Sequence, residues 1–434
     1  MKQVLYSAGN FGASLTLQAI AAFLTYFYVQ VHGVPPVLIS AALIWHAIWA
    51  GIGNPLFGHL SDRTRSRFGR RAPYVLLGAL PLSAAFILLW LPPAHASHTL
   101  LFLWFLGFVF LFDTLYDLVV LNWTALFPEM YRDLAQRASV SAYRQVWGIA
   151  GTVLGMVGMA LLSGSMGWAG AAVLFGVLTL ASLWLSLIGV REDPRASEQA
   201  ALPLREAIFY TFRNRAFVTY VLGAFFVQFT FVAVSGLIPF YSQFVLGGAN
   251  PALFFGAALL MAVPGLFLWR RVAVRKGVRT AAIASAVCYA LSFVPFLFIA
   301  SGILALVFGL LVGIGLSGQM LLLDVMIADI TDEDEVRSGR RREGMYYGVN
   351  GFVVRLVGFL QSLVLLGLAA AGYHAGATHQ PAGAILALRL FVGGLPIVSI
   401  GIALLFWRLY PLHGARLREV KEQVAALHGA VPAD

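Results

Sequence analysis

Long stretches of apolar residues alternate along the chain with short polar or charged segments. A helix needs about 20 mostly apolar residues to cross the hydrocarbon core of a bilayer. Measured on that scale, the apolar stretches predict twelve transmembrane helices, near residues 4–31, 37–60, 73–92, 99–127, 141–164, 167–190, 216–246, 251–270, 280–300, 302–330, 345–372 and 384–409. The pattern therefore predicts an all-α membrane protein.

The basic residues of the loops test this number of helices independently. Lys and Arg gather in the loops after the second, fourth, sixth, eighth and tenth predicted helices and in the C-terminal tail, whereas the opposite loops hold none. Under the positive-inside rule, this asymmetry places both termini in the cytoplasm. We therefore expect a multi-pass protein of the cell inner membrane.

A polar joint after the sixth predicted helix divides the chain. Residues 191–215 contain the longest polar stretch between predicted helices. We expect an N-terminal six-helix bundle at 1–190, a cytoplasmic linker at 191–215, a C-terminal six-helix bundle at 216–410 and a cytoplasmic tail at 411–434. In the tail, charged and apolar residues alternate in a way that suits a short surface helix, for which a solvated terminus is favoured over a partner site.

Composition excludes several other classes of protein. Of the 434 residues, 60% are hydrophobic and 11% are charged, whereas a soluble domain carries about 25% charged residues. The formal net charge of +10 lies on the cytoplasmic loops and gives no reason to expect a nucleic-acid partner. The single cysteine, Cys288, excludes a disulfide within one chain, and neither His-x-x-x-His nor Cys-x-x-Cys occurs. We expect no metal and no cofactor.

Charged residues inside the predicted helices are the strongest chemical signal, because a charge in a membrane is costly and usually faces a cavity or a partner. Six residues share this position: Asp113, Asp117, Arg144, Asp324, Arg355 and Arg389. Asp113 and Asp117 lie four residues apart and so project from one helical face. Such a pair can hold a transferable proton or contact the substrate, with Asp113 the stronger candidate of the two. Alternatively, each carboxylate is neutralised by Arg144 or a hydroxyl and merely holds helices together. We expect Arg389 to be structural.

The two other arginines each need an anion, because a guanidinium keeps its charge in a protein. For Arg144 and Arg355, the anion is either a carboxylate of the chain or an acidic or polyhydroxyl substrate. Asn350 precedes Arg355 on the same predicted helix, and Trp147 follows Arg144 by about one turn. Gln18, in the first predicted helix, is placed to line a polar pathway.

Three segments resemble the major facilitator superfamily and, within it, the glycoside-pentoside-hexuronide cation symporters, the melibiose permease-like family. They are GHLSDRTRSRFGRR at 58–71, ALFPE at 125–129 followed by Arg137 and Tyr143-Arg144, and 328–348 with ADITDEDE and REGMYYG. The resemblance covers essentially the whole chain. It implies two six-helix bundles that rock about a site between them.

The same resemblance assigns residues to a coupling site. The family's paired aspartates of helix 2, which bind the coupling sodium ion or proton, land on Ala50 and Asn54. Hard cations prefer several oxygen ligands, so Asn54 alone is a poor site and sodium coupling is doubtful. We therefore expect any coupling to use protons, through Asp113 or Asp117.

The resemblance also bears on the substrate. Arg144 falls on the family's sugar-contacting arginine, and Arg355 falls where a lysine lies between the sugar and cation sites. The family's sugar-binding aspartates of helices 1 and 4 land on Ser14 and Val120. The cavity is then more basic than a melibiose-type site, which favours an anionic small molecule such as a sugar acid. A sugar or glycoside, a lysolipid-like amphiphile and an uncoupled facilitator stay open, and we expect a monomer.

Charged residues on the cytoplasmic side suit an inner gate that closes in one state and parts in the other. The candidates are Asp62 with nearby arginines such as Arg63, Glu129 with Arg137 or Arg144, and the acidic run from Asp329 beside basic residues such as Arg341. For the acidic run, a solvated loop is an equal alternative.

Two other functions compete with transport. Asp113-x-x-x-Asp117 has the spacing by which polytopic prenyl- and phosphatidyl-transferases hold magnesium and a diphosphate, but the neighbouring second and sixth predicted helices offer no further acids. A non-transporting sensor is the other alternative, because the helix 2 aspartates of the family are missing. We expect a transporter and not an enzyme.

Overall fold

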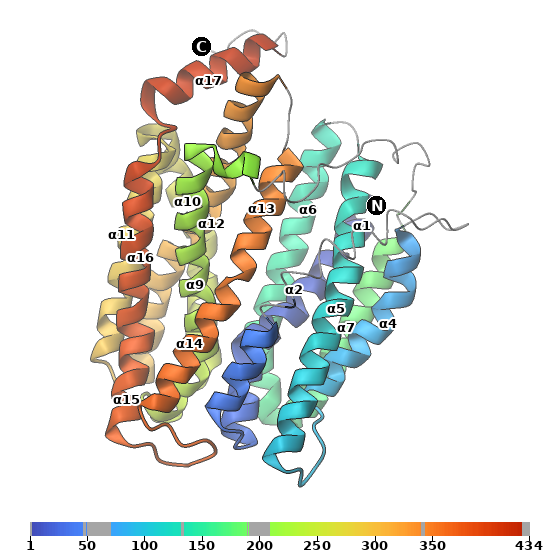
Figure 1. Cartoon of the computed structure of the whole chain (residues 1–434), viewed down its shortest axis with the longest axis vertical. Coiled ribbons are helices and arrows are strands. Elements are labelled where there is room, and N and C mark those ends of the chain that lie inside the picture. Colours follow the sequence, from blue (N-terminus) through green and yellow to red (C-terminus); the bar gives the residue numbers. More distant parts are fainter. Residues whose placement is uncertain are drawn as a thin grey trace.

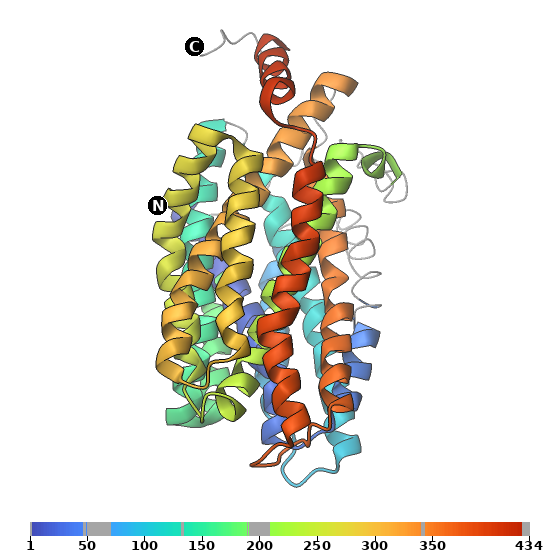
Figure 2. The ribbon, with the colours of Figure 1, turned by 90° about the vertical axis from the view of Figure 1, so that its left-hand side faces the viewer.

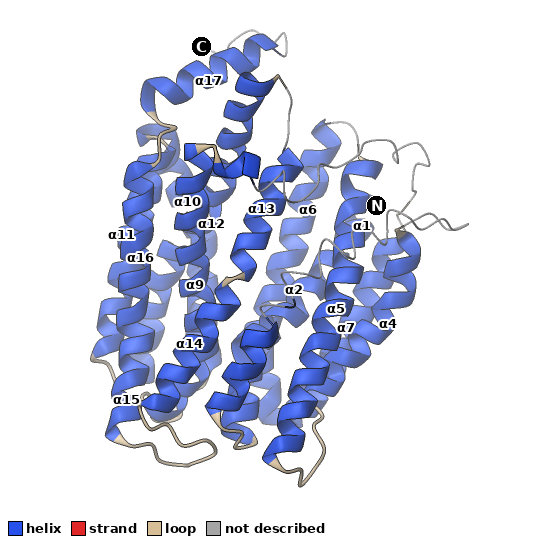
Figure 3. Cartoon of the chain, in the orientation of Figure 1, coloured by secondary structure: helices blue, strands red, loops and turns tan. Residues whose placement is uncertain are grey.

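The computed structural model describes residues 2–46, 49, 71–131, 134–188, 190, 209–339 and 343–427. Throughout these ranges the chain forms helices joined by turns and loops, and no strand occurs in them (Figure 3). The predicted candidates Asn54, Asp62, Arg63 and Arg341 lie outside the described residues, as does most of the linker. The prediction of an all-α protein is confirmed for the described part.

The N-terminal helix group, residues 2–187, contains the first predicted spans. Its elements are α1 (Lys2–Ser7), α2 (Gly9–Ala19), η1 (Ile20–Leu24), η2 (Phe27–Val31), a helix at Pro36–His46, α4 (Ala72–Leu89), α5 (His98–Met130), α6 (Leu134–Val153), η3 (Leu154–Gly158) and α7 (Met159–Leu187). In this group α2 packs against α6 and α7, and α4 packs against α5 and α7.

The C-terminal helix group, residues 215–409, follows, and a last helix lies beyond it. The elements are α9 (Arg215–Phe244), α10 (Pro251–Lys276), α11 (Val278–Phe293), η5 (Val294–Leu297), α12 (Gly302–Ser338), α13 (Glu343–Arg355), α14 (Val357–Ala370), α15 (Ala382–Arg389), η6 (Leu390–Gly394), α16 (Leu395–Leu409) and α17 (Gly414–Leu427). The two groups stand side by side (Figure 1), and their long helices run along one axis (Figure 2).

Nine helices in the described part of the chain are long and apolar enough to cross a membrane. One of them, Tyr143–Leu187, is 45 residues long and contains Gly167, whose φ of 75° and ψ of 166° are not helical. Glycine adopts this conformation without the steric cost that a Cβ would add. The chain therefore kinks where the sequence predicts the joint between the fifth and sixth spans.

Glycines let the helices within each group approach closely. A Cβ on Gly151 of α6 would collide with the backbone of Phe11 in α2, and a Cβ on Gly313 of α12 would collide with the backbone of Ala258 in α10. Membrane helices associate through such close contacts, because lipid offers no hydrophobic driving force. Small residues at these crossings therefore set the spacing within both groups.

The two groups meet at the end of the bundle that carries loops 90–97 and 371–381, called here the far end. The amide Nε2 of Gln30 donates a hydrogen bond of 2.9 Å to the carbonyl oxygen of Ala377, and the hydroxyl of Tyr373 donates one of 2.6 Å to Oε1 of Gln30. Nearby, the rings of Tyr26 and Phe240 pack with centroids 5.1 Å apart. The far end is thus closed by contacts between the groups.

The opposite end carries α17, which is fixed to the acidic end of α12. Lys421 Nζ lies 2.7 Å from Oδ1 of Asp329 and 2.7 Å from Oδ2 of Asp332, and Arg416 Nη2 lies 2.6 Å from Oε1 of Glu333. Burial alone would lower the pKa of Lys421, but the two carboxylates outweigh it and raise that pKa. Two basic residues thus hold α17 against the end of α12, while most of the residues of α17 remain exposed.

These contacts correct the expectation for the acidic run. Residues 329–335 are the last turns of α12 and not a solvated loop, and Asp329, Glu333 and Asp334 are buried. Besides its contacts with α17, the run accepts a hydrogen bond of 3.3 Å from Asn214 to Glu333 at the start of α9. In this conformation the partners of the run come from α17 and from the end of the linker, and the gating role of Asp329 stays a prediction.

The close approach of α10 and α12 leads to a stability prediction. Gly313→Ala is expected to push α12 away from α10 and to lower the free energy of unfolding by about 1–3 kcal/mol, the usual cost of overpacking. Gly401 in α16 has no heavy atom within 4 Å of the place of an added Cβ, so Gly401→Ala is the matched control. Thermal unfolding of both purified variants in detergent measures the difference, and equal melting temperatures would contradict the packing argument.

Candidate functional site

An ion pair joins the two helix groups. Arg355 Nη1 donates to Oδ2 of Asp117 at 2.7 Å, and Nη2 donates to Oδ1 at 2.6 Å. The Asp117 side chain is only 3% exposed and that of Arg355 is 28% exposed. Two parallel bonds between a guanidinium and a carboxylate are among the strongest hydrogen bonds in proteins. The pair therefore fixes α5 of one group against α13 of the other.

A break in a helix positions Arg355. The predicted helix at 345–372 is interrupted in the structure, since α13 ends at Arg355 and α14 begins at Val357 (Figure 3). Discontinuous helices are common at the binding sites of transporters, where they aim backbone and side-chain groups at a ligand. The end of α13 is thus the point where the C-terminal group meets the carboxylate of Asp117.

Asp113 lies one turn before Asp117 on α5 and faces a histidine. His46 Nε2 lies 3.3 Å from Asp113 Oδ2, and one turn after His46 the indole Nε1 of Trp49 donates a hydrogen bond of 3.0 Å to Oγ1 of Thr114. His46 was not among the residues predicted from the sequence to form a site. The signal was present as a titratable residue in the apolar stretch 37–60.

Arg144 sits against aromatic rings. Its guanidinium carbon lies 4.7 Å from the ring centroid of Trp123 and 5.1 Å from that of Phe127. Asn10 Nδ2 donates to the backbone oxygen of Arg144 at 2.7 Å, and Nε of Arg144 is buried without a hydrogen-bond partner. A ring face attracts a cation but leaves its N–H groups unused, so this guanidinium retains donors for a ligand. The counter-charge of Asp117 is the guanidinium of Arg355. Arg144 was the candidate suggested by the sequence.

The first helix links these two arginine sites. Asn10 on α2 contacts Arg144, and one turn later the carbonyl oxygen of Ala13 accepts a hydrogen bond of 3.4 Å from the hydroxyl of Tyr116, the residue before Asp117. Gln18 follows on the same helix, and its Oε1 is buried without a partner. Oδ1 of Asn350 on α13 is also buried without a hydrogen-bond partner. Unsatisfied buried polar groups call for a water or a ligand, and both residues were predicted to contact substrate.

Comparison with known proteins decides the family. Residues 5–414 match the family described as MFS/sugar transport protein. The chain belongs to this family.

Relatives and solved structures agree with this assignment. This chain is 24% identical to the isoprimeverose transporter of Lactiplantibacillus pentosus, over 97% of this chain and 91% of the relative. It is 24% identical to the sodium-dependent lysophosphatidylcholine symporter 1 of Gallus gallus, over 98% and 89%. The crystal structure of the nucleoside transporter NupG, 15% identical, superposes with a TM-score of 0.66 over 94% of this chain and 99% of that one, which shows a shared fold.

The resemblance to melibiose permease-like symporters is therefore confirmed, and the protein is a membrane transporter of the major facilitator superfamily. The family and its relatives are transporters and not enzymes, so the transferase alternative is set aside.

Three further residues were predicted to contact substrate or to belong to an inner gate. Trp147 meets Phe11 edge to face, with ring centroids 5.9 Å apart. Glu129 lies on α5 and Arg137 on α6, but their side chains are outside the described part. The inner-gate pairs of the sequence analysis therefore stay predictions.

Arg389 proves structural, as the sequence predicts. Its Nη1 donates to the carbonyl oxygens of Leu297 at 3.2 Å and Ile299 at 3.0 Å. Backbone oxygens thus accept both hydrogen bonds that Nη1 donates, which ties the side chain to the segment after α11.

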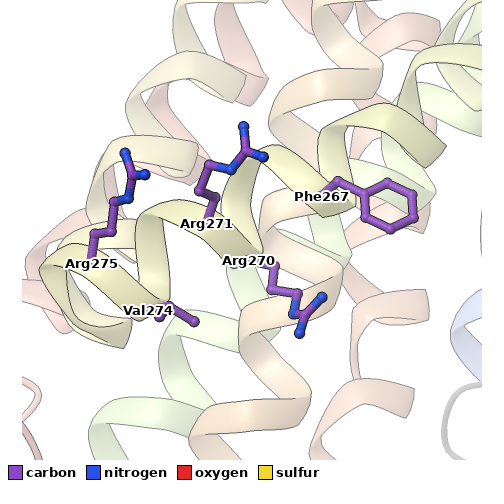
Figure 4. A pocket seen from close by; sticks show the side chains of 5 residues that line it. All are labelled: Phe267, Arg270, Arg271, Val274 and Arg275. Carbon is purple, nitrogen blue, oxygen red and sulfur yellow. The ribbon is translucent and has the colours of Figure 1, made fainter.

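A basic groove at the end of α10 is a poor candidate for the transport site. It is lined by Phe267, Arg270, Arg271, Val274 and Arg275 (Figure 4). Arg271 and Arg275 point to one side of the helix and Arg270 to the other, so the three cations do not converge. The charges of the groove match the loop asymmetry of the sequence.

The ion pair between the groups leads to a second prediction. Arg355→Gln leaves the buried carboxylate of Asp117 without its bidentate partner and is expected to lower the free energy of unfolding by about 3–5 kcal/mol. Adding Asp117→Asn removes the stranded charge and is expected to restore a large part of this loss. Thermal unfolding of both single variants and the double variant in detergent gives the coupling energy as a double-mutant cycle. Strictly additive effects would mean that the pair contributes no coupling.

Proposed function

We propose that this protein is a secondary active transporter that carries a small anionic or polar organic solute, a sugar, glycoside or sugar acid, together with a proton. The observation that carries the proposal is the Arg355–Asp117 pair, which joins the two helix groups. Such a pair must break when the groups part and can re-form when they close. Alternating access by rocking of two bundles requires contacts of this kind.

The topology proposed for this function has twelve transmembrane helices, with both termini in the cytoplasm. The protein is proposed to lie in the cell inner membrane as a monomer. The bundles are 1–190 and 216–410, with the linker 191–215 between them and the tail 411–434 after them. The kink at Gly167 and the apolar helix Pro36–His46 support this number beyond the nine long helices of the described part. The far end then faces outward, so the described conformation is closed to the outside.

Arg144 is the residue proposed to select an anionic substrate. Arg355 is already engaged by Asp117, so the basic character that the sequence assigns to two arginines rests on Arg144 alone. Trp123 and Phe127 hold its guanidinium plane, and a carboxylate can accept two parallel hydrogen bonds from such a plane. Gln18 and Asn350 supply partnerless carbonyl oxygens that suit the hydroxyls of a sugar.

A lysolipid-like amphiphile is the second candidate substrate. A hollow of about 390 Å³ lies between the two groups near the far end, and its lining includes Phe23, Tyr26, Trp168, Gln243 and Asn250. Aromatic walls with a few amides suit a molecule with an apolar chain and a polar head. An uncoupled facilitator for the same solutes is the third candidate.

The charged residues at the α17 end are proposed to form the inner gate. The candidates are Asp62 with nearby arginines such as Arg63, Glu129 with Arg137 or Arg144, and the acidic run from Asp329 beside basic residues such as Arg341. In the described state Asp329 is held by Lys421, so a latch that uses Asp329 requires α17 to move.

The role of Arg144 is tested by two ligands that differ only in a carboxylate. Methyl glucuronide is expected to raise the melting temperature of the purified protein in detergent, and methyl glucoside is expected to raise it much less. Arg144→Gln is expected to abolish the difference, since a bidentate charged contact contributes about 1.5–3 kcal/mol. Arg389→Gln is the matched control and keeps the preference. Equal shifts by both glycosides in the wild type would contradict an anionic substrate, and a shift by lysophosphatidylcholine alone would favour the amphiphile.

The coupling ion is tested with Asp113→Asn in proteoliposomes. Uptake of labelled methyl glucuronide driven by a pH gradient is expected to fall at least about tenfold, because the amide cannot carry a proton, while counterflow without a gradient stays near the wild-type rate. Uptake stimulated by sodium and unaffected by Asp113→Asn would contradict proton coupling. Counterflow without any gradient-driven uptake in the wild type would indicate the facilitator.

A further inference from the structure

A titratable pair lies beside the ion pair that joins the two helix groups. His46 Nε2 is 3.3 Å from Asp113 Oδ2, and the two side chains are 25% and 20% exposed. Oδ2 of Asp113 is buried and accepts no hydrogen bond from the described residues in this arrangement. The histidine comes from a different helix than the carboxylate, and the hydrogen bond from Trp49 to Thr114 holds those helices together one turn away. The two helices thus hold His46 and Asp113 close together, while Oδ2 of Asp113 accepts no hydrogen bond within the described part of the chain.

The surroundings of this pair hold few other charges. Asp117 lies one turn away on α5, Arg355 reaches it from α13, and the hydroxyl of Tyr116 lies between α5 and α2. The other described residues of the helices packed here, α2, α4 and Pro36–His46, include no further Asp, Glu, Lys or Arg. The charge of Asp113 acts on Arg355 as well as on Asp117. A change in the protonation of the His46–Asp113 pair therefore acts directly on the Arg355–Asp117 ion pair, called here the bridge.

The electrostatic consequence has a definite sign. When His46 is neutral, Asp113 is an unbalanced negative charge that adds to the attraction of Asp117 for Arg355. When His46 is protonated, its positive charge balances Asp113, and Arg355 loses that additional attraction. Charges within one helical turn interact by a few kcal/mol at the effective dielectric of a protein. A proton on the pair thus weakens the contact that joins the two groups.

We infer that His46 and Asp113 together form the proton-binding site of this transporter, and that the bound proton releases the Arg355–Asp117 bridge so that the far end can open. The inference rests on the proposed function, which names Asp113 as a coupling acid, and adds His46 as the group that takes up the proton. It also assigns an order: the pair is protonated first, and the groups part afterwards. Histidine suits this role because it titrates between about pH 5 and pH 8.

The test follows the opening of the far end directly. Ala94 and Thr378 are exposed residues of loops 90–97 and 371–381, one from each helix group. Spin labels are attached to Ala94→Cys and Thr378→Cys in a Cys288→Ser background, which removes the single native cysteine. Pulsed electron paramagnetic resonance in lipid nanodiscs, from about pH 8 to about pH 5.5, gives the ratio of long to short distances.

The expected result has a calculable limit. Binding of a single proton changes an equilibrium by at most about tenfold per pH unit, so the ratio of open to closed forms should rise on acidification with a slope between zero and one. His46→Gln is expected to flatten this dependence completely. Trp49→Phe is the matched control, because it removes the neighbouring hydrogen bond between the same helices but no titratable group, and its slope should stay that of the wild type.

Three outcomes would overturn the inference. The first is a wild type whose label distances do not respond to pH, the second is a slope that persists in His46→Gln, and the third is a slope that Trp49→Phe abolishes as completely as His46→Gln does. Asp113→Asn removes the other half of the pair and must also flatten the slope. It provides the same test if His46→Gln does not yield folded protein.

The experiment uses no substrate, so its failure is separate from that of the proposed function. A protein that exchanges methyl glucuronide but shows no pH-dependent opening would keep the proposed function and lose the proton site on His46 and Asp113. A protein that exchanges neither methyl glucuronide, methyl glucoside nor lysophosphatidylcholine would lose the proposed function whatever its label distances show.

Discussion

The pairing of Arg355 with Asp117 is the contact on which the arrangement of the two helix groups depends. Both side chains come from apolar helices, and Asp117 is almost fully buried. Taking two such charges out of water costs several kcal/mol each, and the cost is recovered only with near-ideal geometry. The two bonds of 2.7 Å and 2.6 Å supply that geometry. The pair therefore restrains α5 and α13 strongly in one relative position and little in any other, as a switching contact must.

The other charges in the helices are neutralised by different means, and the differences separate structure from function. Backbone carbonyls surround the guanidinium of Arg389, so its charge is satisfied within the C-terminal group. Aromatic rings flank Arg144, and no carboxylate of the described residues is paired with it. Within the described part of the chain, the partner of Asp113 is the imidazole of His46. A ligand can supply hydrogen-bond acceptors to Arg144, and a proton can balance the charge beside Asp113. Arg389 already donates to backbone oxygens.

Much of the fold follows from hydrophobicity, and the departures have physical causes. The spans expected at 216–246 and 251–270 correspond to Arg215–Phe244 and to the start of Pro251–Lys276. The span expected to end at 330 continues to Ser338, because the acids after it find partners in α17 that hydropathy does not reveal. At the site, the sequence shows that Asp117 and Arg355 each need a counter-charge. It cannot show that they choose each other across 238 positions, and a lone histidine in an apolar stretch resembles packing until its carboxylate is seen.

The two kinds of contact between the helix groups differ in energy, and this difference decides which one controls opening. At the far end the contacts are neutral: hydrogen bonds from Tyr373 to Gln30 and from Gln30 to Ala377, and the packing of the Tyr26 ring on that of Phe240. Each such bond contributes about 0.5–1.5 kcal/mol, because water replaces it when the groups part. Breaking a buried ion pair without compensation costs about 3–5 kcal/mol. The neutral contacts can therefore shape the closed end, but the equilibrium is set by whatever compensates Asp117 and Arg355, and a proton or an anionic substrate beside them is chemically suited to do so.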